Sequence, residues 1–91
     1  MTIWKYQFLP QEIEKTIEVP YLNKLLKIHA QGQYISIWFL VDFIKPEKQH
    51  YTFRIIGTGN IISDEEKFNN EFVYIDTVFI DPFVWHVFKK I

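Results

Sequence analysis

The chain has 91 residues and carries ten basic and eleven acidic side chains, which give a net charge of −1. A chain of this length is expected to form one domain, residues 1–91, that buries only about 60–65% of its unfolded surface. The near-neutral charge excludes a strong overall field for capturing nucleic acid polymers by counterion release, so we expect no nucleic acid polymer as a partner. The absence of cysteine excludes disulfides, thiolate catalysis and cysteine-ligated zinc.

The sequence contains no signal that directs the chain to a membrane. Its first residues lack the basic region and long apolar segment of a signal peptide. No apolar run approaches the ~20 residues of a membrane-spanning helix. We therefore expect a cytoplasmic protein that has no membrane partner.

Alternation of apolar and polar residues predicts strands in the first half of the chain, over residues 3–8, 15–19, 25–31 and 34–43. A short helical turn is expected near residues 11–15. In the third strand, the core face is assigned to Leu26, Ile28 and Ala30. The fourth strand has an unbroken apolar face, formed by Ile35, Ile37, Phe39, Val41 and Phe43. Its opposite face is mixed, which is typical of a central strand that is covered on both sides.

Three more strands are expected in the second half of the chain. Residues 51–58 alternate, and residues 72–88 are rich in β-branched and aromatic side chains that Asp81-Pro82 divides into two strands. The polar loop between them favours a helical turn over residues 63–68, capped by Ser63. The pattern predicts a mainly β fold: a small antiparallel β-sandwich or partly open barrel of about seven strands, with at most short helical turns.

Motifs for catalysis or metal binding are missing. The three histidines, His29, His50 and His86, follow no HxH or HExxH spacing. The acidic residues of the 61–71 loop are better explained as a solvated turn than as an acid–base pair. We therefore expect no enzymatic activity, no catalytic residue, no metal and no cofactor.

Arg54 is the residue that most suggests a binding site. It is the only arginine in the chain, and it stands in the middle of a predicted strand. Its planar guanidinium suits phosphate or carboxylate and stacks on aromatic rings. By alternation it shares a face with Thr52 and Thr58. An alternative interpretation is that Arg54 pairs with Asp42 or Asp76 and covers aromatic surface.

Other groups near Arg54 in the predicted sheet complete a candidate nucleotide site. The turn at Gly57 and Gly59 permits close backbone approach, and its amides can form a small anion nest. Trp38 and Trp85 offer indoles for stacking a base. Pairing of residues 34–43 with residues 51–58 would bring Trp38 close to Arg54. The predicted ligand-binding residues are Trp38, Thr52, Arg54, Gly57, Thr58, Gly59, Trp85 and His86.

Four segments carry a resemblance to a known family: IWKY at 3–6, SIWFLVD ending at Asp42, TFRIIGTG at 52–59 and PFVWHVF at 82–88. Together they resemble a widespread family of small phage proteins with a domain of unknown function. Phage proteins of this size include anti-CBASS sponges, which bind cyclic nucleotide immune signals as oligomers without cleaving them. The resemblance therefore implies immune evasion in the host cytoplasm by a homo-oligomer that sequesters a cyclic nucleotide.

Two other functions remain open at the level of the sequence. The chain can act as an interaction protein whose sheet edges or surface bind a host protein. It can also be a structural phage component, whose aromatic residues all serve the core and interfaces.

Overall fold

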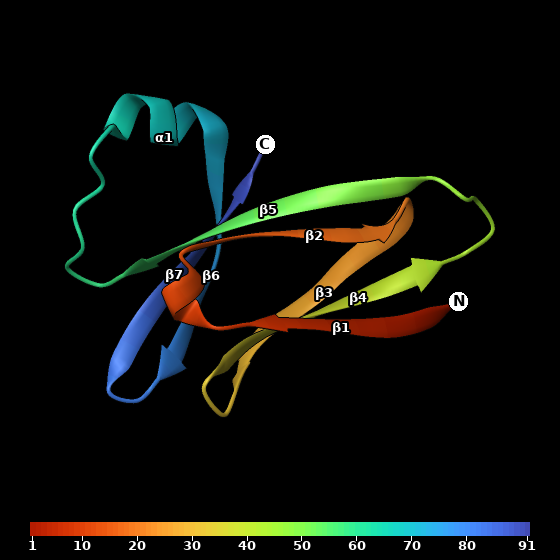
Figure 1. Cartoon of the computed structure of the whole chain (residues 1–91), viewed down its shortest axis with the longest axis horizontal. Coiled ribbons are helices and arrows are strands. Elements are labelled where there is room, and N and C mark those ends of the chain that lie inside the picture. The colour runs from red at the N-terminus through yellow and green to blue at the C-terminus, as the bar shows by residue number, and fades with distance from the viewer.

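Seven strands form two antiparallel sheets in the computed structural model, which describes residues 1–91 (Figure 1). Sheet A has the order β1-β4-β3, with β1 at Thr2–Phe8, β4 at Tyr34–Asp42 and β3 at Leu22–Gln31. Sheet B has the order β2-β5-β7-β6, with β2 at Glu14–Pro20, β5 at Lys48–Gly57, β7 at Phe83–Lys90 and β6 at Phe72–Ile80. The predicted mainly β class is confirmed, and the two separate sheets make the fold a sandwich.

The hydrophobic core lies between the two sheets and draws on both. Alternation along each strand turns one set of apolar side chains inward, as the sequence pattern predicts. Phe39 on β4 and Phe53 on β5 are fully buried, and each ring lies against Tyr51. The remaining core residues are Phe8, Ile17, Val19, Ile28, Ile35, Ile37, Val41, Ile55, Val78, Ile80 and Val87.

Two tyrosine hydroxyls form hydrogen bonds between the sheets, one donated from sheet A to sheet B and the other from sheet B to sheet A. Tyr6 on β1 donates to the carbonyl of Glu18 on β2 at 2.8 Å. Tyr51 on β5 donates to Oδ1 of Asn23 on β3 at 2.7 Å. Burial is the main cause that raises the pKa of both tyrosines above 10.0, so both phenols favour their neutral, donating form.

The two helical segments are short. The turn expected at residues 11–15 is a 3-10 helix, η1, at Pro10–Glu12. The turn expected at 63–68 is helix α1 at Glu65–Glu71, and its cap is Asp64 rather than Ser63, because Oδ1 of Asp64 accepts the amide of Lys67. Phe68 anchors α1 by packing on Phe72 and Phe88. The helix thus covers one end of sheet B, beside the start of β6 (Figure 1).

Two side chains assigned to the core face lie elsewhere. Leu26 is exposed, because a β-bulge between Leu25 and Lys27 interrupts the alternation of β3 and places Leu25 against the core. Phe43 lies beyond the end of β4 and is half exposed, although its ring still contacts Trp4 at 4.9 Å.

The expected pairing of residues 34–43 with residues 51–58 is wrong. β4 pairs with β1 and β3 in sheet A, whereas β5 pairs with β2 and β7 in sheet B. The chain between β4 and β5 therefore crosses from one sheet to the other. The prediction that β4 is a central strand is confirmed, since β4 lies between two partners.

Candidate functional site

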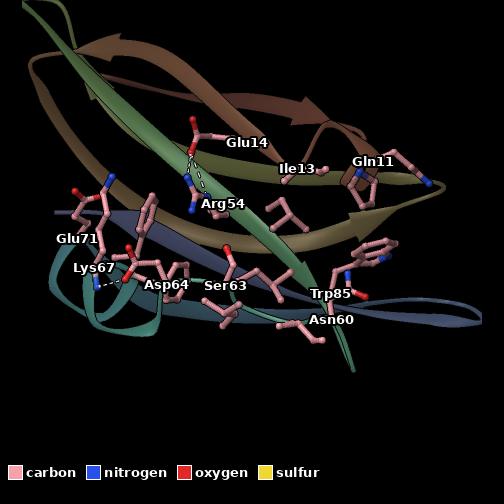
Figure 2. Close-up of a pocket in the computed structure, with 17 residues that line it drawn as sticks. Gln11, Ile13, Glu14, Arg54, Asn60, Ser63, Asp64, Lys67, Glu71 and Trp85 are labelled. Carbon is pink, nitrogen blue, oxygen red and sulfur yellow. Dashed lines mark hydrogen bonds and ion pairs between the residues drawn. The ribbon is translucent and has the colours of Figure 1, made fainter.

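An open pocket lies where β5 extends beyond its partner β2. β2 begins at Glu14, which pairs with Arg54, so the end of β5 passes beyond β2. Ile13 continues the pairing through its carbonyl, which accepts the amide of Ile55 at 2.7 Å. On the other side lie the loop after β5 and helix α1 (Figure 2). The pocket between them has a volume of about 850 Å³, within the range of small-ligand sites.

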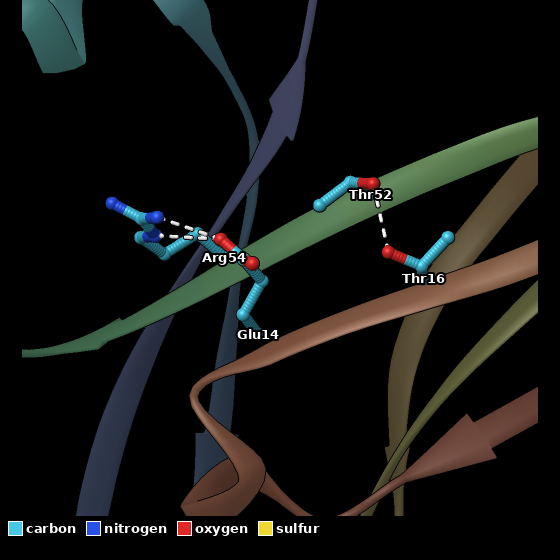
Figure 3. A network of polar contacts seen from close by, with 4 residues as sticks. All are labelled: Glu14, Thr16, Thr52 and Arg54. Carbon is cyan, nitrogen blue, oxygen red and sulfur yellow. Dashed lines mark hydrogen bonds and ion pairs between the residues drawn. The ribbon is translucent and has the colours of Figure 1, made fainter.

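Arg54 lies at the middle of this pocket and contacts Glu14 and an aromatic ring (Figure 2). Its Nη2 and Nε donate to the same oxygen of Glu14, at 2.6 and 3.2 Å (Figure 3). Its guanidinium carbon lies 4.5 Å from the centre of the Phe72 ring, a cation–π contact. The ion-pair partner is thus Glu14 and not Asp42 or Asp76, whose carboxylates accept backbone amides nearby.

The ion pair remains partly accessible. The side chains of Arg54 and Glu14 are 38% and 47% exposed. A surface pair of this kind contributes roughly 0–1 kcal/mol to stability, so the fold does not depend on it. The guanidinium also has donors that are not committed to Glu14, because only Nε and Nη2 are engaged by it. Arg54 can therefore accept a second anionic partner without unfolding the sheet.

The rest of the lining combines apolar walls with groups that form hydrogen bonds. Gln11, Asn60 and Ser63 contribute amides and a hydroxyl, and Phe68 and Phe72 contribute ring surface. The charged lining residues are two cations and three carboxylates: Arg54, Lys67, Glu14, Asp64 and Glu71. Their net charge of −1 disfavours a ligand that carries many negative charges.

Two exposed isoleucines line the pocket from opposite sides. Ile13 follows η1 and is 61% exposed, and Ile61 in the loop after β5 is 93% exposed. Ile13 has a φ of 64°, which is strained for a β-branched residue. Strain of this kind is often found at binding sites, where the surrounding structure holds it in place. The two side chains add exposed apolar surface to the pocket lining.

The structure brings only part of the predicted site together. Arg54 and Trp85 both line the pocket, with Trp85 at the end nearest Asn60 (Figure 2). Thr52 lies two residues from Arg54 along β5, where its hydroxyl shares a 2.9 Å hydrogen bond with Thr16 (Figure 3). Thr52 is thus beside Arg54 on the same face of the sheet but does not line the pocket.

The turn at residues 57–60 has a structural role. Gly59 has a φ of 89°, a backbone conformation that favours glycine. A Cβ at Gly57 would lie 3.1 Å from Nδ2 of Asn60 and 3.2 Å from the Trp85 ring, so a side chain there would require these neighbours to shift. The amides of Thr58 and Asn60 donate to the carbonyls of Val84 and Gly57, so these two amides do not form an anion nest.

His86 forms a separate polar network next to the pocket. Its Nε2 shares a 2.7 Å hydrogen bond with Oγ1 of Thr58, and its Nδ1 shares a 3.0 Å bond with Oγ1 of Thr77. Thr77 in turn bonds to the hydroxyl of Tyr74 at 2.6 Å. Both ring nitrogens of His86 are therefore occupied, and His86 and Thr58 do not line the pocket.

Trp38 lies far from this site, on the other sheet. It pairs with Lys5 and Lys27 on the outer face of sheet A, because β4 does not pair with β5. It cannot stack a base that is bound beside Arg54.

Sequence reasoning missed most of the pocket lining, including Glu14, Ile13, Asn60 and Lys67. One signal could have pointed to Glu14: it directly precedes the predicted strand over residues 15–19, and pairing of that strand with residues 51–58 can bring its carboxylate to Arg54. No local pattern gives the partner or register of that strand. The structure contains no cluster of three or more histidine or acidic side chains arranged for a metal ion. Neither helical segment has the length and apolarity of a membrane-spanning helix.

The fold and the pocket define a class: a seven-stranded antiparallel sandwich with an open pocket of mixed polarity at the end of one sheet. Comparison with family models matches residues 1–91 to a family described as a domain of unknown function (DUF7352), and the chain belongs to this family. No curated protein and no solved structure matches the chain.

Proposed function

We propose that the chain is a non-enzymatic binding protein that holds a small anionic signal molecule, a cyclic nucleotide, in the pocket around Arg54. The observation that carries this proposal is the position of Arg54, the only arginine, in the middle of a pocket of about 850 Å³ with part of its guanidinium open to solvent. Arginine is well suited to phosphate because its donors form a planar fork.

The pocket suits a ligand that combines a planar ring with few phosphates. Ile13 and Ile61 can cover the faces of a base, and Asn60 and Gln11 can form hydrogen bonds with its edge. A phosphate that contacts Arg54 competes with Glu14 and must offset the negative charge of the lining. Low phosphate number therefore favours binding, which is the reason for proposing a cyclic nucleotide rather than a linear triphosphate.

Binding alone is sufficient for the proposed role. A protein in excess of its ligand, and above the Kd, lowers the free concentration of that ligand by mass action. The resemblance to small phage proteins supports a sponge that protects a phage from nucleotide-signalled defence in the host cytoplasm, acting as a homo-oligomer. The aromatic surface left exposed on the β6–β7 hairpin supports the oligomer.

Thermal denaturation with a panel of cyclic mono-, di- and trinucleotides tests this proposal. At 100 times its Kd, the correct ligand stabilises the protein by about 2.7 kcal/mol and raises Tm by roughly 10 °C or more. Arg54→Ala is expected to remove this shift while changing the Tm of the free protein little. The ligand recovered after denaturation should keep its mass, since a changed mass indicates an enzyme.

Glu14→Gln is the matched variant for the same pocket. It removes the competing carboxylate and neutralises the lining, so the affinity for an anionic ligand should increase by roughly tenfold, given that a charge pair near a protein surface is worth a few kcal/mol at most. If the whole panel leaves Tm unchanged in both the wild type and Glu14→Gln, the nucleotide proposal is wrong.

Interaction through the sheet surface is a second candidate, favoured by the apolar side chains of the β6–β7 hairpin. Phe79 and Phe83 are 72% and 60% exposed at its tip, where Phe83 contacts Trp85. Exposed aromatic groups of this kind mark interfaces. The test compares capture of a host protein by the wild type and by Phe79→Ser with Phe83→Ser. Equal capture by both proteins rules out the hairpin as the interface.

A further inference from the structure

The outer face of sheet A gathers lysines around a tryptophan. We define the lysine face by Lys5, Lys24, Lys27, His29, Tyr34 and Trp38. Lys5 and Lys27 pair with Trp38 from opposite sides, so all three side chains leave the same face of the sheet. Neighbouring strands are about 4.8 Å apart, which places Trp38 between two cations whose backbones are roughly 10 Å from one another.

The β-bulge in β3 is the reason that Lys24 belongs to this face. Lys24 and Lys27 are three residues apart, and regular alternation would direct them to opposite faces. The bulge between Leu25 and Lys27 adds one residue, so Lys24 pairs with Leu40 and Lys27 pairs with Trp38. Leu40 and Trp38 share a face of β4, and the two lysines therefore do so as well.

Acidic residues are almost absent from sheet A. Its three strands carry Lys5, Lys24 and Lys27 but a single carboxylate, Asp42, at the end of β4. The Asp42 carboxylate is engaged by the amide of Ile44. The net charge of −1 for the whole chain thus hides a positive sheet A and a negative remainder. At physiological ionic strength charges act over only about 8 Å, so the local excess decides what binds here.

The side chains of the lysine face are exposed and partly oriented. Lys5, Lys24, Lys27 and His29 are exposed, and Trp38 is half-buried. Nζ of Lys5 donates to Oε1 of Gln31 at 2.9 Å, which also accepts the hydroxyl of Ser36 at 3.2 Å. Tyr34, on the same face, offers a second ring about 13 Å along β4 from Trp38.

From this arrangement we propose that the lysine face binds single-stranded nucleic acid through its phosphates and through base stacking on Trp38. Lysines flanking an aromatic ring on an open sheet are the combination that holds a single strand without reading its sequence. A duplex cannot use the ring, because its bases are already stacked on one another. This site is on the opposite sheet from Arg54, so it does not depend on the function proposed for the pocket.

Fluorescence anisotropy with a labelled single strand of about ten nucleotides tests the proposal. Three lysines predict that log K falls with log salt concentration with a slope of about −2, since each phosphate contact on a single strand contributes roughly −0.7. Lys24→Gln with Lys27→Gln should reduce this slope to about −0.7 and weaken binding at low salt. Lys89→Gln with Lys90→Gln, on sheet B, removes the same charge and should leave the slope unchanged.

The stacking part of the proposal has its own variant. Trp38→Ala should weaken binding roughly tenfold without changing the salt slope, because it removes a ring and no charge. If Trp38→Ala lowers the stability of the protein, Lys24→Gln with Lys27→Gln still tests the proposal, because both of these lysines are exposed. Arg54→Ala should bind the strand as the wild type does.

Three results would overturn the proposal. The wild type could fail to bind the strand at low salt, or it could bind duplex and single strand with equal affinity. The Lys89 and Lys90 control could also lose as much affinity as the Lys24 and Lys27 variant. Sedimentation with vesicles that contain phosphatidylserine supplies one more. Binding to those vesicles without binding to the oligonucleotide would identify an anionic lipid surface as the partner instead.

Discussion

The two sheets differ more in the side chains and elements on their outer faces than in the side chains of their inner faces. Both inner faces are aliphatic and aromatic and join in one core. Outside, sheet B carries a helix, a pocket and cations that stand among carboxylates, such as Arg54 beside Glu14. Sheet A carries no helix, and lysines dominate its outer charge. In this small sandwich, the shared core supports two outer surfaces with different chemistry.

The difference follows from which strands are neighbours in the sheets. β2 contributes glutamates to sheet B, whereas β1 and β3 contribute only cations among their charged residues. Because consecutive strands β2 and β3 belong to different sheets, Glu18 on β2 and Lys24 on β3 have different neighbours although they are close in sequence. The strands of each sheet have a net charge of +2, so the sheets differ in how many carboxylates stand beside their cations: one in sheet A and three in sheet B. The acidic excess of the chain lies outside the strands, mainly in helix α1 and the turns.

The largest expected effect tests whether the two sheets share one core. Phe39→Ala in sheet A and Phe53→Ala in sheet B should each lower the free energy of unfolding by about 3–5 kcal/mol, since both rings are fully buried. Urea denaturation followed by circular dichroism measures this loss. Each variant should unfold in one transition. Two separate transitions would mean that the sheets are independent units.

A smaller effect is expected for the helix that distinguishes sheet B. Phe68→Ala should cost about 2 kcal/mol, less than a core phenylalanine, because α1 can partly collapse onto the vacated space. The ring is buried against Phe72 and Phe88, both on sheet B. The matched control is Phe43→Ala, a half-exposed ring just beyond the end of β4 that should cost about 0.5 kcal/mol. If chemical denaturation gives the same loss of unfolding free energy for Phe68→Ala and Phe43→Ala, Phe68 does not anchor α1 to sheet B.

The smallest effect per side chain, about 1 kcal/mol, concerns the two tyrosines that connect the sheets. The pKa values of Tyr6 and Tyr51 are raised above 10.0 in the folded protein, chiefly by burial. Above pH 10 the unfolded chain therefore loses these protons first, and stability falls as the pH rises through the folded pKa values. Below pH 10 this contribution is complete and constant.

Tyr6→Phe with Tyr51→Phe checks this pH dependence. Loss of the two hydrogen bonds should cost about 1 kcal/mol each at neutral pH, and the decline of stability above pH 10 should become shallower. Tyr21→Phe, an exposed tyrosine, is the control. A wild-type protein whose stability does not change between pH 9 and 11 would contradict the raised pKa values.

The local elements of the fold could be predicted from the sequence with good agreement. The alternation of Trp4, Tyr6 and Phe8, or of Tyr51, Phe53 and Ile55, directly gives a strand and its inner face. The main error on β3 came from the bulge at Leu26, because a single inserted residue reverses the alternation and leaves no mark in the composition. The site was predicted less well, since only Arg54 and Trp85 of the eight candidates line the pocket.

The sequence by itself determined seven strands, the inward faces of those that alternate regularly and the absence of cysteine chemistry, because these depend on side-chain periodicity and residue type within short segments. The tertiary structure decided that β4 and β5 belong to different sheets, that Glu14 meets Arg54 and that Trp38 stands among lysines. Strand pairing joins residues far apart in the chain, and many registers satisfy the same alternation. Only the complete core, packed from both sheets, selects one of them.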